Sequence, residues 1–150
     1  MSLSGVYTYD ASQVILSING TVLGGFADGT FVEVERTSPS FTKIVGADGR
    51  TSRAKTNDIS GSVTVTLAQT SPSNDVLSLL HNQDLINNTA IFPVMMQDAS
   101  GTTTLFTGTG WVEGLPKTDF AKDISNRAWV IHVSQMQFTI SGNTGSANLA

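Results

Sequence analysis

The two histidines are the first residues to test for chemistry, because imidazole can act as a base, a nucleophile or a metal ligand. His81 and His132 stand far apart in the sequence, and the chain contains no cysteine. No His-x-x-x-His spacing, Gly-x-Ser-x-Gly turn or calcium-loop pattern accompanies them. The sequence therefore predicts no metal centre, no cofactor and no hydrolytic triad.

Paired carboxylates are the second candidate for catalysis. Glu33 with Glu35, and Asp119 with Asp123, would supply the acid and the base of a glycosidase. That reaction also needs two carboxyl groups that face each other across a cleft. We favour the ordinary interpretation, a solvated acidic strand face and a charged loop, and we do not expect the chain to be an enzyme.

The basic residues have the most uneven distribution in the chain. Five of the eight lysines and arginines fall between Arg36 and Lys55, while acidic residues predominate elsewhere. Two interpretations of this segment stay open: a solvated mobile loop, or a surface that docks onto an acidic partner. Copies of the same protein offer such a partner, and head-to-tail contacts between copies close into rings or continue as filaments.

The composition favours a protein that assembles. Charged residues make up 13% of the 150 residues, about half the usual share, so much of the surface is uncharged and polar. Such a surface is easier to explain if partners cover it. The net charge of −4 argues against tight binding of nucleic acid. Without a basic and then apolar leader, or a run of about 18 apolar residues, neither conventional export nor a membrane span is expected.

Strand-like runs and turn dipeptides predict a mainly β fold. Asn19-Gly20, Asp28-Gly29 and residues 98–101 separate such runs, and the first of these is typical of a two-residue type I′ hairpin. In the run that follows Asp28-Gly29, Glu33 and Glu35 share one strand face and valines occupy the other. We expect a single domain over the whole chain, built as a two-sheet sandwich or a squashed barrel.

One flanking helix is expected over about residues 72–83. Ser71 suits the N-cap, and Pro72 suits the first helical position. The apolar stripe of this helix is predicted to comprise Val76, Leu79 and Leu80, with Leu77 alongside.

The last regular element covers residues 127–140. Its apolar face switches near Ser134, which predicts a bulge or one strand that crosses from one sheet to the other. Gly108 and Gly110, which precede it, are expected to relieve a bend or a bulge.

A long polar stretch over about residues 46–57 breaks the strand pattern. Hairpin loops usually need two to five residues, so an extended loop of about a dozen is more often functional than accidental. Asp48-Gly49 is a candidate turn within it. The end segments 1–8 and 141–150 are expected to be flexible.

Several segments resemble the tail tube proteins of contractile-tailed bacteriophages. The resemblance spans roughly residues 9–142 and is specific in combination, although no single segment is diagnostic. The segments that carry it are Gly25-Phe-Ala-Asp-Gly-Thr-Phe-Val-Glu-Val-Glu-Arg36, Phe41-Thr-Lys-Ile-Val-Gly-Ala-Asp-Gly49, Asn57-Asp58, residues 63–77 and Ser125-Asn-Arg-Ala-Trp129. The resemblance implies two β-sheets with a flanking helix, a fold shared with the tubes of type VI secretion and of pyocins.

The resemblance also implies how subunits assemble. Six subunits close a ring, the inner sheets join into a continuous β-barrel, and a long loop reaches a neighbouring ring. Residues 46–57 match that loop, so the candidates for contacts between rings are Lys43, Arg50, Arg53 and Lys55. Glu33 and Glu35 are the candidates for the channel wall, where like charge would let DNA pass without adhering.

The implied function is that of a virion structural protein. Stacked hexameric rings would form the inner tail tube, which houses the tape-measure protein and conducts the genome into the host. The implied partners are other copies of the chain and the tail sheath, tape-measure, baseplate and tail-terminator proteins, while genomic DNA passes without specific binding. The implied location is the virion tail, after assembly in the host cytoplasm.

A carbohydrate-binding or adhesin module is the alternative function. Such a module would present exposed aromatic side chains on which sugars stack. Trp111 and Trp129 each lie in strand-like runs, and we prefer core packing as the interpretation of both.

Overall fold

The computed structural model describes residues 6–142. Within this range the chain forms one α-helix, a short 3-10 helix (Ala11–Gln13) and ten strands. The strands are β1 (Val14–Ile18), β2 (Thr21–Val22), β3 (Val32–Arg36), β4 (Phe41–Val45), β5 (Thr51–Lys55), β6 (Gly61–Ala68), β7 (Phe92–Asp98), β8 (Thr104–Val112), β9 (Asn126–Val133) and β10 (Gln137–Thr139). The predicted mainly β fold is confirmed. Most of the two end segments that were expected to be flexible lies outside the described residues.

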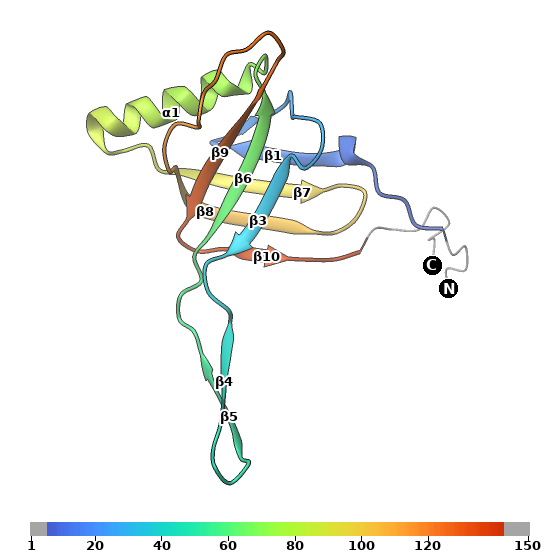
Figure 1. Ribbon diagram of the computed structural model, residues 1–150, viewed down its shortest axis with the longest axis vertical. Helices are drawn as coiled ribbons and strands as arrows, with labels where there is room; N and C mark the ends of the chain where they lie inside the picture. The colour runs from blue at the N-terminus through green and yellow to red at the C-terminus, as the bar shows by residue number, and fades with distance from the viewer. Residues whose placement is uncertain (1–5, 143–150) are drawn as a thin grey trace.

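Two layers of strands cross each other in the body of the molecule (Figure 1). One layer contains β2, β1, β7, β8 and β10, and the other contains β9, β6 and β3. The two layers are one hydrogen-bonded sheet, because the end of β8 also pairs with β9. The sheet therefore folds over itself into a sandwich and does not close into a barrel, so of the two expected architectures the sandwich is the one observed.

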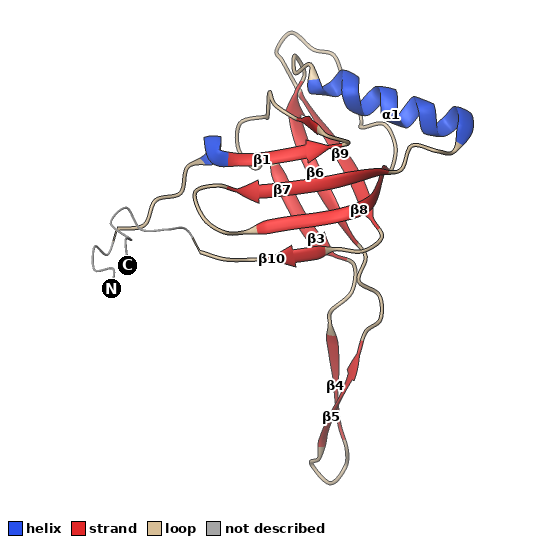
Figure 2. Cartoon of the chain, turned by 180° about the vertical axis from the view of Figure 1, so that it is seen from behind, coloured by secondary structure: helices blue, strands red, loops and turns tan. Residues whose placement is uncertain are grey.

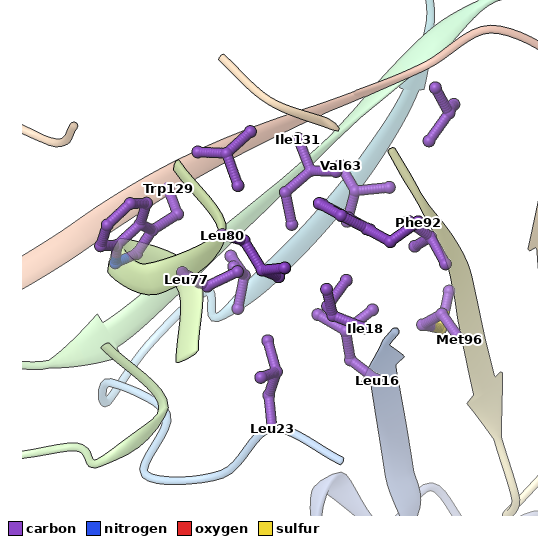
Figure 3. Close-up of a cluster of buried hydrophobic side chains, with 14 of the residues drawn as sticks. Leu16, Ile18, Leu23, Val63, Leu77, Leu80, Phe92, Met96, Trp129 and Ile131 are labelled. Atoms are coloured by element: carbon purple, nitrogen blue, oxygen red, sulfur yellow. The ribbon is translucent and has the colours of Figure 1, made fainter. Parts of the chain in front are cut away.

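The core fills the space between these layers. In Figure 3 the side chains of Leu16, Ile18 and Phe92 from one layer point toward those of Val63 and Ile131 from the other layer. All five of these side chains are buried, and they belong to one cluster of apolar residues. Strand alternation produces this arrangement, since in β6 every second residue from Gly61 onward is buried.

The helix α1 (Ser73–Asn87) lies outside the layers, next to β9 (Figure 1). Its predicted apolar stripe is partly wrong. Leu77 and Leu80 are buried and Val76 is partly buried, but Leu79 is 68% exposed. Two residues along a helix correspond to a rotation of about 200°, so a face that buries Leu77 turns Leu79 toward solvent.

Both ends of α1 differ slightly from the sequence expectation. Pro72 occupies the cap position, while the Ser71 hydroxyl accepts a hydrogen bond from the backbone NH of Ser73 at 3.2 Å and so still satisfies an N-terminal donor. The helix continues beyond residue 83 to Asn87. It ends where Asn88 adopts a left-handed φ of 59° and donates its NH to the Asp84 carbonyl at 2.8 Å.

Several turn and register predictions are confirmed. Asn19 and Gly20 have φ angles of 53° and 81°, as a type I′ turn requires. The apolar face switches after Val133, because β9 pairs with β6 while β10 pairs with β8 in the other layer. Gly110 lies opposite a register shift in β7, so this glycine sits at an irregularity of the sheet as expected.

Replacing Gly61 with alanine is expected to destabilise the fold by about 1–3 kcal/mol, because an added methyl group overfills a packed site. The new Cβ would lie 2.5 Å from the Glu35 carbonyl oxygen and would also overlap the Met136 side chain. Urea unfolding measures the change. Gly114→Ala is the matched control, since its Cβ would meet no atom within 4 Å. Equal unfolding midpoints for the two variants would contradict this packing.

Candidate functional site: a basic hairpin and an acidic sheet face

Strands β4 and β5 form a separate two-stranded hairpin that projects from the body of the molecule (Figure 2). Asp48 and Gly49 make its turn, as predicted. The φ of Gly49 is 82°, and the Asp48 carboxylate accepts a hydrogen bond from the backbone NH of Arg50 at 3.0 Å. All ten strand residues of the hairpin are exposed.

This hairpin corrects the expectation of an extended loop over residues 46–57. The projection is there, but Thr51–Lys55 is a strand that pairs with Phe41–Val45. The polar sequence of residues 51–55 conceals that strand, because neither of its faces is buried and no apolar alternation is needed. A clue lies in the symmetry of the segment, in which two five-residue runs flank Asp48-Gly49.

The strand pairing gives the hairpin two different faces. Lys43 lies opposite Arg53, and Phe41 lies opposite Lys55. Because every second residue shares a face, one face carries the following residues, which we call the basic hairpin face: Phe41, Lys43, Val45, Thr51, Arg53 and Lys55. The other face has only uncharged residues: Thr42, Ile44, Ser52 and Ala54. Arg50 lies in the turn and belongs to neither strand.

Apolar side chains accompany the positive charges of the basic hairpin face. Phe41 is 46% exposed and Val45 is 56% exposed. The Arg53 guanidinium lies over the Phe41 ring, 4.3 Å from its centroid, which is a cation–π contact. This face can therefore recognise an apolar surface bordered by acidic groups. Residue types alone did not single out Phe41 as a partner of Arg53.

Charge is strongly divided between the hairpin and the rest of the chain. Residues 41–55 contain four basic residues and one acidic residue, so their formal charge is +3. The other residues contain four basic and eleven acidic residues, a charge of −7, and the two parts together give the −4 of the whole chain. The hairpin is thus a cationic projection on an anionic body.

Asp58 holds the base of the hairpin, where the chain returns to the sheet. Its Oδ1 accepts hydrogen bonds from the hydroxyl and the backbone NH of Ser60 at 2.6 and 3.0 Å. Its Oδ2 accepts one from the Ser38 hydroxyl at 3.3 Å. The Ser60 hydroxyl, followed by the Ser60 backbone NH, lowers the pKa of Asp58, because both donors stabilise the charged carboxylate. Asp58 therefore links the segments that leave and re-enter the sheet.

Glu33 and Glu35 are exposed on the outer face of the β3–β6–β9 layer. Their neighbours across the strands are small or uncharged: Glu33 pairs with Thr64, which pairs with Val130, and Glu35 pairs with Ser62, which pairs with His132. These six residues, which contain no lysine or arginine, are here called the acidic sheet face. Val32 and Val34 pack against the core instead, so the predicted division of β3 into a core face and an acidic face is confirmed.

The other candidates for chemistry do not form a site among the described residues. Glu33 and Glu35 stand side by side on one strand rather than across a cleft. Asp119 lies 3.6 Å from the buried Arg127 and is part of an ion pair. His132 approaches Glu113 at 3.4 Å, and residues 6–142 hold no group of three or more histidine, cysteine or acidic residues that could bind a metal ion.

The tryptophans follow the expected core packing to different degrees. Trp129 is 2% exposed, and its indole NH donates to the Asn74 side chain at 2.9 Å. Trp111 is partly exposed, with its ring 5.9 Å from that of His132. Trp129 is therefore too buried for a sugar to stack on its ring.

In the described part of the chain, the one helix is too short or too polar to cross a membrane.

The fold is shared with parts of contractile injection systems of known structure. It superposes on the anti-feeding prophage tube-terminating cap with a TM-score of 0.64 at 10% identity, over 94% of this chain and 97% of the other. For the sheath/tube terminator of PVC, an extracellular contractile injection system, the TM-score is 0.63 and the identity is 13%. That match covers 91% of this chain and 100% of the terminator chain. For a chain of the PVC sheath-tube complex, the TM-score is 0.59 and the identity is 13%, and the match covers 90% of this chain and 93% of the other. This chain therefore shares its fold with these tube and tube-terminator chains.

The sequence shows the family to which the chain belongs. Residues 8–141 match the model of the bacteriophage PhiTE tail tube protein family, and the chain belongs to that family. It is also 33% identical over 144 residues to structural protein ORF10 of Pseudomonas phage KPP10, a match that covers 91% of this chain and 83% of the phage protein. The predicted resemblance to tail tube proteins is confirmed, and the protein is a structural component of a phage tail.

Replacing Asp58 with alanine is expected to loosen the base of the hairpin, because the variant loses the acceptor of three hydrogen bonds. Amide hydrogen exchange at Ser60 should become faster at pH 7. In the wild type, the ionised Asp58 carboxylate stabilises the folded state fully above the ordinary aspartate pKa of 3.8. This stabilisation is lost as the pH falls through the lower pKa that Asp58 has in the folded state. Asp48→Ala is the control, because it removes a carboxylate in the turn of the hairpin and not at its base. Equal exchange rates of the Ser60 amide in the wild type and in Asp58→Ala would refute the role of Asp58.

Proposed function

We propose that six copies of this chain close into a ring and that the rings stack into the inner tube of a contractile phage tail. The projecting hairpin is the observation that carries the proposal. An isolated two-stranded hairpin is at best marginally stable in water. This one nevertheless leaves Phe41, Ile44 and Val45 between 46% and 64% exposed. A neighbouring subunit that covers the hairpin accounts for both its extended shape and its apolar residues.

The division of charge supports head-to-tail stacking. A cationic projection on an anionic body attracts a second copy in one orientation and repels it in others. Such a contact is heterologous, because the hairpin of one copy meets a different surface of the next. Repetition of that contact builds a polar filament of rings. In this arrangement Lys43, Arg50, Arg53 and Lys55 make the contacts between rings.

The open edges of the sheet support closure within a ring. Strands β2 and β3 end the hydrogen-bonded order, so each has an edge that pairs with no strand of the described chain. Exposed edges of this kind invite pairing with another chain. A neighbour in the ring that pairs with such an edge continues the sheet from subunit to subunit. The inner sheets of six subunits then form one barrel around a channel.

The acidic sheet face is assigned to the channel wall. Its six residues include Glu33 and Glu35 and contain no lysine or arginine. Phosphate groups adhere where lysine and arginine replace their counterions, so DNA slides along a wall of this composition without specific binding. The same channel houses the tape-measure protein before the genome passes.

The mechanism is mechanical and electrostatic. The sheath surrounds the tube and contracts, the rigid tube is driven into the host envelope, and the genome then passes through it. No bond is made or broken by this chain. Baseplate and tail-terminator proteins cap the two ends of the tube, and the rings assemble in the host cytoplasm before they become part of the virion tail.

Reversing three charges of the basic hairpin face is expected to block stacking and leave the fold intact. In the variant Lys43→Glu, Arg53→Glu, Lys55→Glu, like charges face each other across the contact, which costs several kcal/mol. Negative-stain microscopy should show single rings or short stacks in place of long tubes, with an unchanged circular dichroism spectrum. Lys117→Glu with Lys122→Glu is the control, since both residues are exposed and far from the hairpin in sequence. Tubes of wild-type length would remove the hairpin charges from the mechanism.

Making the acidic sheet face basic is expected to impair genome passage but not tube assembly. In the variant Glu33→Lys, Glu35→Lys, the channel wall would bind phosphate groups, and this binding would weaken as salt rises. Virions with this variant should have tails of normal length, adsorb normally and release DNA more slowly in an ejection assay. Asp123→Lys, an exposed position in the loop before β9, is the control. Shortened tails would instead place Glu33 and Glu35 in a contact between subunits.

A further inference from the structure

An apolar groove of about 540 Å³ opens between the two layers beside the edge strand β3. Val32 and Val34 of β3 form one wall, and Met96 and Phe138 of the other layer form the opposite wall. Tyr9 and Ile140, which also line the groove, are 56% and 77% exposed. The two layers therefore diverge here and leave apolar side chains that the chain does not cover in its described part.

The lining of this groove contains one acidic residue and no basic residue. Asp98 is one of its lining residues, and Asp10 and Asp28 are the immediate sequence neighbours of the lining residues Tyr9 and Gly29. No lysine, arginine or histidine is among the residues that line the groove. The groove thus combines an apolar lining with one carboxylate, and we call Asp98 together with its neighbours Asp10 and Asp28 the acidic border.

We propose that this groove receives the basic hairpin face of a second copy of the chain. The inference rests on the proposed function and assigns the surface that the hairpin meets in the tube. The two surfaces complement each other in both respects: Phe41 and Val45 fit the apolar lining, while Lys43, Arg53 and Lys55 oppose the acidic border. The occupant is another copy, because the hairpin of the same chain projects away from the body that holds the groove (Figures 1 and 2).

One other exposed apolar surface, on the opposite side of β1, β7 and β8, lacks the charge that the hairpin demands. On the outer face of β1, β7 and β8, Ile15, Met95 and Phe106 are 42% to 51% exposed. Their cross-strand neighbours on that face are uncharged, since Ile15 pairs with Gln97 and Met95 pairs with Ser17. An uncharged strip of this kind offers nothing to lysine or arginine. The groove, unlike this strip, has an acidic residue in its lining.

Cross-linking tests the inference directly, because the chain has no cysteine of its own. The variant Val45→Cys, Ile140→Cys places one thiol on the basic hairpin face and one at the groove, both at exposed positions. A short bismaleimide added to assembled tubes should give a ladder of linked subunits on a denaturing gel. The matched control is Val45→Cys, Ile86→Cys, whose second thiol lies on the exposed side of α1, at a residue 83% exposed in the wild type. This control should stay at the position of the single subunit.

The outcomes separate this inference from the proposed function. A ladder with Ile140→Cys that is lost in the background Lys43→Glu, Arg53→Glu, Lys55→Glu supports docking in the groove. Tubes that form but give a ladder only with Ile86→Cys, or with neither pair, overturn the groove and leave the tube intact. A link within one chain also overturns it. If the wild-type protein forms no rings or tubes, the proposed function fails and this inference fails with it.

Discussion

Strand β8 makes the hydrogen bonds on which the architecture depends. One part of it pairs with β10, and its end pairs with β9, so it belongs to both layers. Gly110 permits this change of partner, because a side chain there would overlap Val94 and crowd the backbone of β9. Without that shared strand, two apolar sheet faces would not lie against each other. The core, the orientation of α1 and the edge strand β3 all follow from this fold of one sheet over itself.

A sheet folded in this way leaves the domain incomplete in two places. Within residues 6–142, its edges stay unpaired because the sheet does not close into a barrel. Its hairpin stays outside the core because, in the part of the chain that the structure describes, β4 and β5 pair only with each other. In an isolated protein both features would promote aggregation. In the proposed tube, the same features provide the surfaces through which identical subunits meet in a defined order.

In the proposed tube, electrostatics selects among the contacts that these surfaces allow. Apolar burial is nondirectional, so on its own it would not decide which face of the hairpin meets which surface. The separation of +3 on residues 41–55 from −7 on the rest of the chain adds direction. The likeness to tube and terminator structures at 10% to 13% identity shows the fold alone, and it indicates that the strand arrangement tolerates wide changes in sequence. In the proposed assembly, the surface charges therefore add a direction that the shared fold alone does not supply.

Local sequence determined the features that depend on neighbouring residues. Asn19-Gly20 specified its turn because those residues accept positive φ, and the apolar switch after Val133 specified the crossing between layers. Only the tertiary structure decided what depends on partners distant in the chain or on exposed strand pairing. Examples are the exposure of Leu79, the strand formed by residues 51–55, and the Asp58 hydrogen bonds to Ser60 and Ser38. The groove was also decided by the tertiary structure, because its walls come from segments that meet only after the sheet has folded over itself.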